Sequence, residues 1–491
     1  MKISTYIKDQ YGVDINVRKE WERQTEVWQS WYAGYCKDFH LYEIWNGRGH
    51  IKKRRKTLQL PKKSCEDWAD ILYNANCAVT VADQGSNELL TKVLTRMSAW
   101  ALINQSIERA FAAGTGALVM AVSDLNYDSS TGSAAPSDKS SPRLEFVPVE
   151  KIYPISWTAD RCTECAFVTA KTIRSKHYIT LSAHIIGDNG NYIIENRIFE
   201  QSKSGDITEL SAEEEDRLLG AFRSFDTGSD KRWFCLLSPA VANNIVPPTH
   251  PAYDYPFGVS IFANALDSAK ATDECYDSLS NEINLGRKRV FVSDDMCEDI
   301  DGNLVFDTND ISVYTVPKGF SSQSLLQAEN SPLRTTELIS ALEANLSAYS
   351  SAVGMGKDMY KFDAANMNTA AQVYSSNSEL KRKRDKHITR LENELYDIMD
   401  ALCYAVSSFT TLGNINPEGL TIKFDNSTFE DTETTSNRKL REVEAEVADR
   451  AEYRMEVYKE DLETAKQRIA EVDAENAARL KAMMPAAEND G

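Results

Sequence analysis

The sequence predicts an α+β fold that is rich in helix, and three observations support this. Hydrophobic residues make up 42% of the 491 residues and aromatic residues 9%, with only 14 Pro and 22 Gly, which is typical of a globular protein. Short β-branched runs alternate with turn residues between Leu144 and Phe199, the pattern of a small antiparallel sheet. From Asn264 onward, apolar residues recur at helical spacing over long segments.

The N-terminal region predicts two helices, each followed by a strand. The first sixty residues are rich in Trp and Tyr and end in the basic run Lys52 to Lys56, interpreted as a docking surface with a solvated basic turn. The segment KKSCEDWADILYNANCAVTV predicts a helix and then a strand. A second helix is expected from about Leu89 to Ala112, before a glycine-flanked strand at Ala117 to Val122.

Two polar segments interrupt this α+β body. The segment from Ser123 to Pro142 is dominated by Ser, Asp, Gly, Ala and Pro, so we expect a mobile insertion between two strands. A second polar insertion runs roughly from Lys203 to Ser229. The body is expected to end after the loop VPPTHPAYDYPFG.

Long helices then alternate with shorter elements. Asn264 to Gly286 predicts about 35 Å of helix at 1.5 Å per residue. A β-rich excursion follows, with strand-like runs at Val290, Leu304 and Ile311 and a tight turn at Asp301 and Gly302. Ser331 and Pro332 predict the N-cap and first turn of a returning helix that ends near Val353.

A glycine-flanked loop separates this returning helix from a third one. Gly354 and Gly356 are expected to be too flexible to continue the helix. Thr369 and Gln372 form a capping-box pattern at the start of a long helix that reaches Val406. A strand at TIKFD and one or two charged helices between 437 and 480 complete the chain. Because a projecting two-helix hairpin cannot bury both of its faces alone, the order of elements predicts a homo-oligomer.

The charge balance argues against tight binding of nucleic acid. The chain has 55 Lys and Arg against 74 Asp and Glu, a net charge of -19, so nucleic acid must meet a local basic feature. The run Lys381 to Arg384 with Lys386 is the strongest such feature, and pairing with acidic neighbours is favoured over facing phosphate. Lys357 and Lys361 are better candidates, because a loop can follow a moving polyanion without holding it.

Catalytic motifs are weak or missing in the sequence. Gly114 to Gly116 lacks a Walker sequence, and the six His show no metal-ligand pairing. Cys162 and Cys165 have C-x-x-C spacing without a second pair. The cluster Asp294, Asp295, Glu298, Asp299 and Asp301 is interpreted as a solvated hairpin rather than a two-metal or calcium site. We therefore expect no enzyme, no cofactor and no metal.

Targeting signals are also not expected. Nine scattered cysteines favour a reduced compartment, and the N-terminal sequence MKISTYIKDQYGVDIN has no apolar run that would predict a secretory signal. No membrane span is expected anywhere in the chain.

A series of segments occurs in a fixed order along the chain: QSWYAGY, KKSCEDWADILYNA, AAGTGALVMAV, YPFGVSIFANALDSAKATDECYDSLSNEINLGRKRVFV, NTAAQVYSSNSELKRKRDKHITRLENELYDIM and KFDNSTFEDTETTSNRKLREVEAE. This collinear series resembles the Gp6-like portal proteins of long-tailed, double-stranded DNA bacteriophages. The resemblance implies a portal fold with an α+β wing, long stem helices, a small β-rich clip and a helical crown. By that resemblance the regions are wing 1–260, stem helix 261–289, clip 290–331, stem helix 332–353, tunnel loop 354–368, wing helix and strand 369–429, and crown 430–491.

The resemblance also implies a function and partners. Portals of this family form dodecameric rings at a capsid vertex, through which double-stranded DNA is packaged and ejected. They bind the large terminase subunit, the head-tail connector, and capsid and scaffolding proteins; the expected location is the virion, with the host cytoplasm during assembly. The DNA-channel loop would use Gly354, Gly356, Lys357 and Lys361. The partner-docking clip would use Asp294, Asp295, Asp301, Gly302 and Asn303.

Two other functions stay open at the level of sequence. One is a metal-dependent phosphodiester-cleaving enzyme that uses Asp294, Asp295 and Asp299. The other is a capsid-interior scaffold protein built on the charged C-terminal helices.

Overall fold

The computed structural model divides into two compact units, Met1–Phe424 and Asp425–Gly491. The residues that it describes are 1–13, 15–45, 49–128, 133–158, 161–219, 223–286, 289–293, 313–316, 326–329, 332–357, 359–360, 370–425, 439–445, 447–458, 460 and 462–483. Both helices and strands are well represented, which confirms the α+β class.

The helices of the first unit largely follow the predicted pattern. They are α1 (Ile3–Tyr11), α2 (Ile15–Tyr32), α3 (Lys37–His40), α4 (Leu60–Leu72), α5 (Gln84–Arg96), α6 (Ala99–Ala113), α7 (Ala212–Leu219), α8 (Leu266–Leu285), α9 (Thr335–Ala352) and α10 (Ala370–Phe409). The single helix expected from Leu89 to Ala112 is instead the pair α5 and α6. The break lies at Ser98, whose φ of 51° is left-handed and cannot continue a right-handed helix.

A six-stranded antiparallel sheet forms the β part of the body, as the alternating runs predict. Its strands are β8 (Ile152–Thr158), β9 (Arg161–Ile173), β10 (Lys176–Ile186), β11 (Tyr192–Gln201), β12 (Ile207–Glu209) and β13 (Ser224–Asp226). The order is β12-β11-β10-β9-β8, and β13 also pairs with β11. Successive side chains alternate between the two faces of this sheet.

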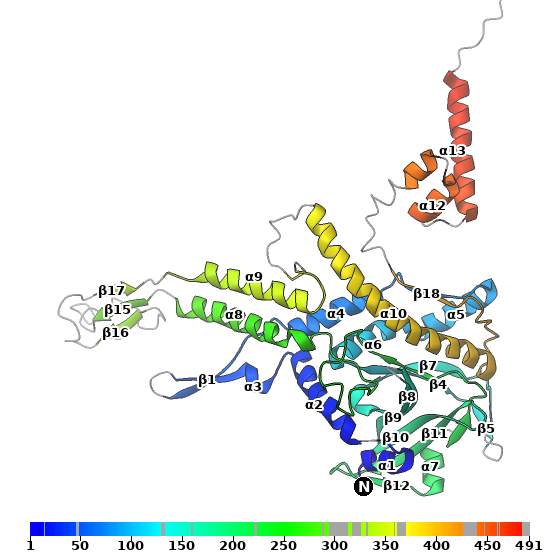
Figure 1. Cartoon of the computed structure of the whole chain (residues 1–491), viewed down its shortest axis with the longest axis horizontal. Helices are drawn as coiled ribbons and strands as arrows, with labels where there is room; N and C mark the ends of the chain where they lie inside the picture. The colour runs from blue at the N-terminus through cyan, green and yellow to red at the C-terminus, as the bar shows by residue number, and fades with distance from the viewer. Residues whose placement is uncertain are drawn as a thin grey trace, which may run out of the picture. The chain divides into compact units, whose positions relative to one another are not determined.

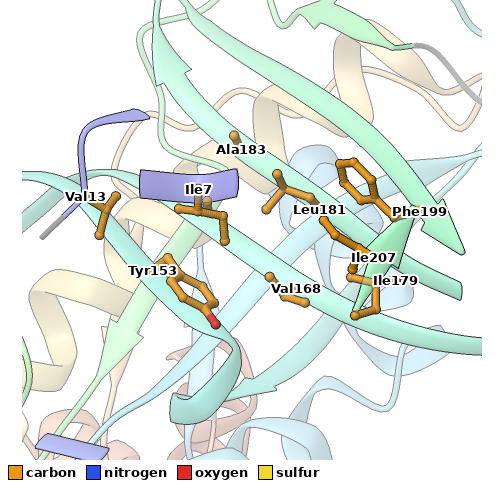
Figure 2. Close-up of a cluster of buried hydrophobic side chains, with 10 residues drawn as sticks. Ile7, Val13, Tyr153, Val168, Ile179, Leu181, Ala183, Phe199 and Ile207 are labelled. Atoms are coloured by element: carbon orange, nitrogen blue, oxygen red, sulfur yellow. The ribbon is translucent and has the colours of Figure 1, made fainter. Parts of the chain in front are cut away.

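One face of the sheet packs against the first helix. Ile7 of α1 lies over Val168, Leu181 and Phe199 in a fully buried cluster (Figure 2). The opposite face carries Phe167 and His184, whose rings contact Phe234 of the next sheet. The sheet is therefore covered on both faces.

A second sheet is covered by the longest helix. It consists of β14 (Phe234–Leu237), β4 (Gly116–Ser123) and β7 (Ser141–Pro148), in that order. The apolar stripe of α10 is buried over this sheet, as its spacing predicts (Figure 1). Smaller ladders join β1 (Leu41–Trp45) to β2 (His50–Arg54), β3 (Ala78–Thr80) to β18 (Thr421–Lys423), and β5 (Asn126–Asp128) to β6 (Ser133–Ala135).

The described residues of both polar insertions form ordered structure, so the expectation of a mobile insertion from Ser123 to Pro142 was wrong. In the first, β5 and β6 pair as an antiparallel hairpin, and Ser137 and Ser140 donate hydrogen bonds to the carbonyl of Asp124. In the second, β12 and β13 extend the six-stranded sheet by pairing with β11. Backbone pairing and side-chain-to-backbone hydrogen bonds order these segments despite their low apolar content.

The second unit is helical, which confirms the helices expected between 437 and 480. It contains α12 (Arg450–Tyr458) and α13 (Leu462–Met483). Arg450 and Asp473 join the two helices by an ion pair of 2.8 Å.

Two glycines allow a close backbone contact between the body and the segment that enters α8. A Cβ at Gly114 would lie 2.5 Å from the carbonyl oxygen of Gly258, and a Cβ at Gly258 would lie 2.6 Å from that of Gly114. The contact is completed by Thr115, whose hydroxyl oxygen accepts from the Gly258 amide at 2.8 Å. The amide of Ile261 donates to the carbonyl of Phe111 at 3.0 Å. Side chains larger than hydrogen would force these two segments apart.

Replacing Gly114 should destabilise the protein through two separate effects. Gly114→Ala places a Cβ against backbone and also imposes a φ of 83°, so we expect a loss of about 3 kcal/mol or more in the free energy of unfolding. Gly190→Ala is the matched control, because Gly190 has the same φ of 83° with nothing within 4 Å, and should lose only about 1 kcal/mol. Chemical denaturation measures both, and equal losses would contradict the steric contact.

Burial of His184 should make the fold sensitive to acid. Burial lowers the pKa of His184 from 6.5 to about 3, so between these values the unfolded chain binds a proton that the folded chain does not. The contribution of His184 to the free energy of unfolding is fully present above pH 6.5. It falls by about 1.4 kcal/mol per pH unit as the pH drops toward 3. His184→Gln and His184→Leu should both flatten the slope of unfolding free energy against pH. If either variant keeps the wild-type slope, the assignment is wrong.

Candidate functional site

The helices α8 and α9 form an antiparallel hairpin that is the central feature of the candidate site (Figure 1). The buried positions along α9 are Leu342, Leu346, Tyr349 and Ser350. The side chain of Asn345 donates to the carbonyl of Ala271 across the helix pair at 3.2 Å. The hairpin therefore buries one stripe of each helix and leaves the rest exposed.

The far end of the hairpin is closed by an ion pair. The guanidinium of Arg334 lies 2.9 Å from the Glu282 carboxylate, and its hydrogen bonds lower the pKa of Glu282. The N-cap of α9 is Arg334 and the helix begins at Thr335, so Pro332 precedes the helix and the predicted first-turn proline was wrong. Ser331 lies outside the described residues.

A three-stranded sheet joins the two helices at this end, which confirms the predicted β-rich excursion. It comprises β15 (Arg289–Ser293), β16 (Val313–Val316) and β17 (Leu326–Glu329). β15 pairs with β16 in parallel and with β17 antiparallel. The predicted run at Val290 lies in β15, whereas Leu304 and Ile311 lie outside the described residues. The strand β17 was not expected from the sequence.

Two buried carboxylates one turn apart anchor the base of α8. Asp273 accepts a hydrogen bond from the amide of Leu58 at 2.9 Å, and its other oxygen lies 3.3 Å from the His40 ring. Asp277 accepts from the Tyr42 hydroxyl at 2.8 Å and from the Lys56 amide at 3.2 Å. Burial raises the pKa of Asp273. The segment 40–58 is thus held along α8 by hydrogen bonds to charged acceptors, which contribute about 1.5–3 kcal/mol each.

The loop after α9 begins as a tightly bonded turn. Gly354 has a φ of 83° and its amide donates to the carbonyl of Ser351, while the Met355 amide donates to that of Ser350 at 2.9 Å. This pair of bonds is the Schellman motif, which requires a left-handed residue after the helix. Gly354 and Gly356 both have positive φ, and α9 ends at Ala352, which confirms that the helix does not continue through them. Both glycines are also buried, so the turn is packed against its surroundings.

The same turn folds back onto α9 and α4. The hydroxyls of Ser350 and Ser347 donate to the carbonyls of Gly356 and Lys357 respectively. The indole of Trp68 donates to the carbonyl of Val353 at 3.0 Å. Further along, the Tyr360 hydroxyl donates to the Asp67 carboxylate at 3.0 Å. Between 353 and 360, the described part of the loop is anchored at both ends.

The structure describes only some of the predicted site residues. Gly354 and Gly356 lie in the anchored turn, and the side chain of Lys357 beside them is exposed. Outside the described residues lie Lys361 and the predicted clip residues Asp294, Asp295, Asp301, Gly302 and Asn303.

The basic run on α10 is divided between core and surface. Arg384 is buried and its Nε donates to the carbonyl of Ile71 at 3.4 Å. Lys381, Arg382 and Lys386 are exposed. The methylenes of Lys383 lie 3.5 Å from where a Gly354 Cβ would be, so this side chain covers the start of the loop. A helix that faces both a core and solvent separates adjacent residues in this way.

A network of ion pairs that the sequence analysis missed fixes α10 to the body. The buried Arg232 contacts Glu394 at 3.3 Å and also pairs with Asp397, which in turn pairs with Arg161. Arg161, Glu394 and Asp397 border a pocket of 680 Å³ beside α10. The acids are spaced i and i+3 on a helix, but their basic partners lie more than 150 residues away in sequence. No local signal could have found the pairing.

Burial disfavours the charged forms of Cys165 and His387, two of the cysteines and histidines that the structure describes. Cys162 and Cys165 are buried free thiols, and burial raises the pKa of Cys165 well above its usual range. His387 is buried against Trp68 and accepts from the amide of Ala240, and burial lowers its pKa to about 3. In the described part of the chain, no group of three His, Cys, Asp or Glu side chains is arranged to hold a metal.

Membrane insertion has no support among the described helices, none of which combines the length and apolar character needed to cross a bilayer.

Comparison with solved structures found distant similarities. One match is the "Neck of native GTA particle computed with C12 symmetry", with 10% identity, a TM-score of 0.40, and coverage of 85% of this chain and 95% of that chain. Another is the "Virion of native gene transfer agent (GTA) particle", with 11% identity, a TM-score of 0.36, and coverage of 81% and 89% respectively. Comparison with curated proteins gave no match.

Comparison with family models gave a match that covers both helices of the hairpin. The matching model is described as "Phage portal protein, SPP1 Gp6-like" and spans residues 243–479. These residues include α8, α9, the loop and α10. The family whose model matches residues 243–479 is thus the portal family that the sequence resembles.

Proposed function

We propose that this portal protein assembles into a dodecameric ring at a capsid vertex and serves as the conduit for packaging and ejection of double-stranded DNA. The observation that carries the proposal is the family match over the α8–α9 hairpin and the loop that follows it. The hairpin supports assembly, because it keeps large apolar side chains exposed that a neighbouring copy can bury. The location follows from the family: the virion, after assembly in the host cytoplasm.

The regions of the chain have distinct roles in this proposal. Residues 1–260 and 369–429 form the wing, and 261–289 and 332–353 form the stem. Residues 290–331 form the clip, which docks the large terminase subunit and later the head-tail connector. Residues 354–368 form the tunnel loop, and 430–491 form a crown beside the capsid and scaffolding proteins. The anchored turn at Gly354 supports the loop assignment, since it holds the exposed Lys357 at a defined place.

We further propose that the chain acts without catalysis. Work on DNA is done by a partner ATPase, and the portal provides passage and retention. The net charge of -19 suits this role, because a channel that bound phosphate tightly would stop translocation. The competing enzyme hypothesis depends on Asp294, Asp295 and Asp299, which lie outside the described residues.

Ring assembly is the first test. Purified wild-type protein should appear in negative-stain images as rings with a central channel, and mass photometry should give a mass near twelve times the 55.1 kDa chain. A homogeneous monomer over a wide range of concentration and salt would contradict the proposal.

The loop lysines give a second test, in assembled phage. Lys357→Glu with Lys361→Glu should leave rings intact but reduce packaged DNA severalfold, because repulsion replaces brief contacts with phosphate. Lys8→Glu with Lys92→Glu is the matched control: it changes the net charge equally at exposed sites on α1 and α5 and should package normally. DNA per particle is the measurement, and normal packaging by the loop variant would dismiss the contact.

A further inference from the structure

The β1–β2 hairpin exposes several large apolar side chains to solvent. Its exposed side chains are Leu41, Ile44, Trp45 and Ile51, of which Trp45 is 63% exposed. Cross-strand pairing places Ile44 opposite Ile51 and Trp45 opposite His50. Because neighbouring positions on a strand point to opposite faces, both faces of the ribbon are apolar. An isolated two-stranded hairpin is at best marginally stable in water, so a ribbon of this kind needs a cover.

The base of the ribbon is held firmly while its outer part is not. His40, Tyr42 and the backbone of residues 56 and 58 are fixed to α8 through Asp273 and Asp277. Arg55 adds an ion pair of 3.4 Å to Glu274. Beyond Tyr42 the strand continues to Trp45, about 10 Å further at 3.3 Å per residue. The ribbon is thus an arm that starts on α8 of its own chain and presents its apolar part outward (Figure 1).

Charge indicates what covers the arm. Residues 50–56 contain Lys52, Lys53, Arg54, Arg55 and Lys56 and no acid, and β1 adds only Glu43. The helices α8 and α9 have the opposite balance, with seven acidic residues against the single Lys270. Of these acids, Asp267, Glu274 and Glu337 are exposed. Asp267 pairs with Lys270 and Glu274 with Arg55 of the same chain.

Apolar surface on the helix pair complements the arm in the same way. The exposed large apolar side chains on and beside α8 and α9 are Ile283, Leu333 and Ile339, all near the far end of the hairpin. Every copy of the chain therefore has a basic arm with exposed apolar side chains on its strands and an acidic hairpin with exposed apolar side chains near one end.

We propose that the β1–β2 arm of one copy packs against the α8–α9 hairpin of a neighbouring copy. In this arrangement Ile44, Trp45 and Ile51 cover apolar side chains at the neighbour's hairpin end, and Lys52 and Lys53 face its acids. The inference rests on the proposed ring and adds the contact that joins neighbours. Double-stranded DNA is the less suitable cover, because phosphates would satisfy the lysines but leave the aliphatic side chains on both faces exposed to water.

A cross-linking experiment locates the partner of the arm. Trp45 is replaced by the photo-cross-linker p-benzoylphenylalanine, and light and nitrogen-15-labelled chains are mixed before ring assembly. We expect mixed-isotope cross-linked peptides that join position 45 to residues 266–285 or 333–352. The same replacement at Trp100, which is 46% exposed on α6, is the matched control and should give none of these peptides.

An assembly measurement tests the energetic role of the arm. Ile51→Asp should raise the protein concentration at which half of the chains are in rings by about tenfold or more. Ile186→Asp, at a similarly exposed position on β10, should leave that concentration unchanged. Circular dichroism of each variant separates lost assembly from lost folding.

The outcomes distinguish this inference from the proposed function. Wild-type rings without inter-copy cross-links at position 45, or with assembly unaffected by Ile51→Asp, would overturn the arm contact and leave the portal function standing. Cross-links to added double-stranded DNA in place of protein would overturn it as well. A wild-type chain that stays monomeric would overturn both proposals.

Discussion

Two carboxylates on one face of α8 fix the α8–α9 hairpin to residues 40–58. Asp273 and Asp277 are one helical turn apart, so both face the same side, and each accepts a backbone amide and contacts a side chain from residues 40–58. A buried carboxylate without such partners would be strongly destabilising. Segments more than 200 residues apart in sequence are thereby fixed together. The position of the β1–β2 arm and the direction of α8 depend on this contact.

Gly114 and Gly258 approach each other closely just before the chain enters α8. This contact complements the carboxylates of α8 in fixing where the helix begins. The carboxylates attract the N-terminal segment to the helix, whereas the glycines allow the chain to leave the body in contact with α6. From there the hairpin returns along α9 to the Schellman turn at Gly354, which Trp68 of α4 and Lys383 of α10 cover. The hairpin, the loop and the long helix therefore share one set of supports. These contacts would transmit a movement of α8 and α9 to the loop.

Charge is distributed to match this architecture. The acidic excess of the chain is marked on α8 and α9, and basic residues are concentrated on the arm and in residues 381–386 of α10. Some basic charge is structural, since Arg384 of this run and Arg232 are buried and bonded within the body. The net charge alone therefore does not show how much basic charge is exposed and able to contact a partner. In the proposed ring, the exposed remainder serves contacts between copies and brief contacts with DNA.

Much of the architecture was predictable from local patterns. The periodicity of apolar residues determined α8, α9 and α10, and the β-branched alternation determined the antiparallel sheet, because both depend on which side chains must face a core. The collinear series of segments identified the portal family, which the match over residues 243–479 confirmed. Boundaries set by single residues were less predictable: a left-handed Ser98 divides one expected helix, and Arg334 replaces the expected cap of α9.

Only the tertiary structure decided which residues support the candidate site. Asp273, Asp277 and Arg232 look like ordinary surface charges in the sequence, and their partners are 150 or more residues away. The polar insertions acquire order from backbone pairing of β5 with β6 and of β12 and β13 with β11, and Gly354 is held in a bonded turn. The physical reason is that amphipathic periodicity is a local property of the chain. Burial of a charge, close approach of two backbones and exposure of Trp45 exist only once distant segments are brought together.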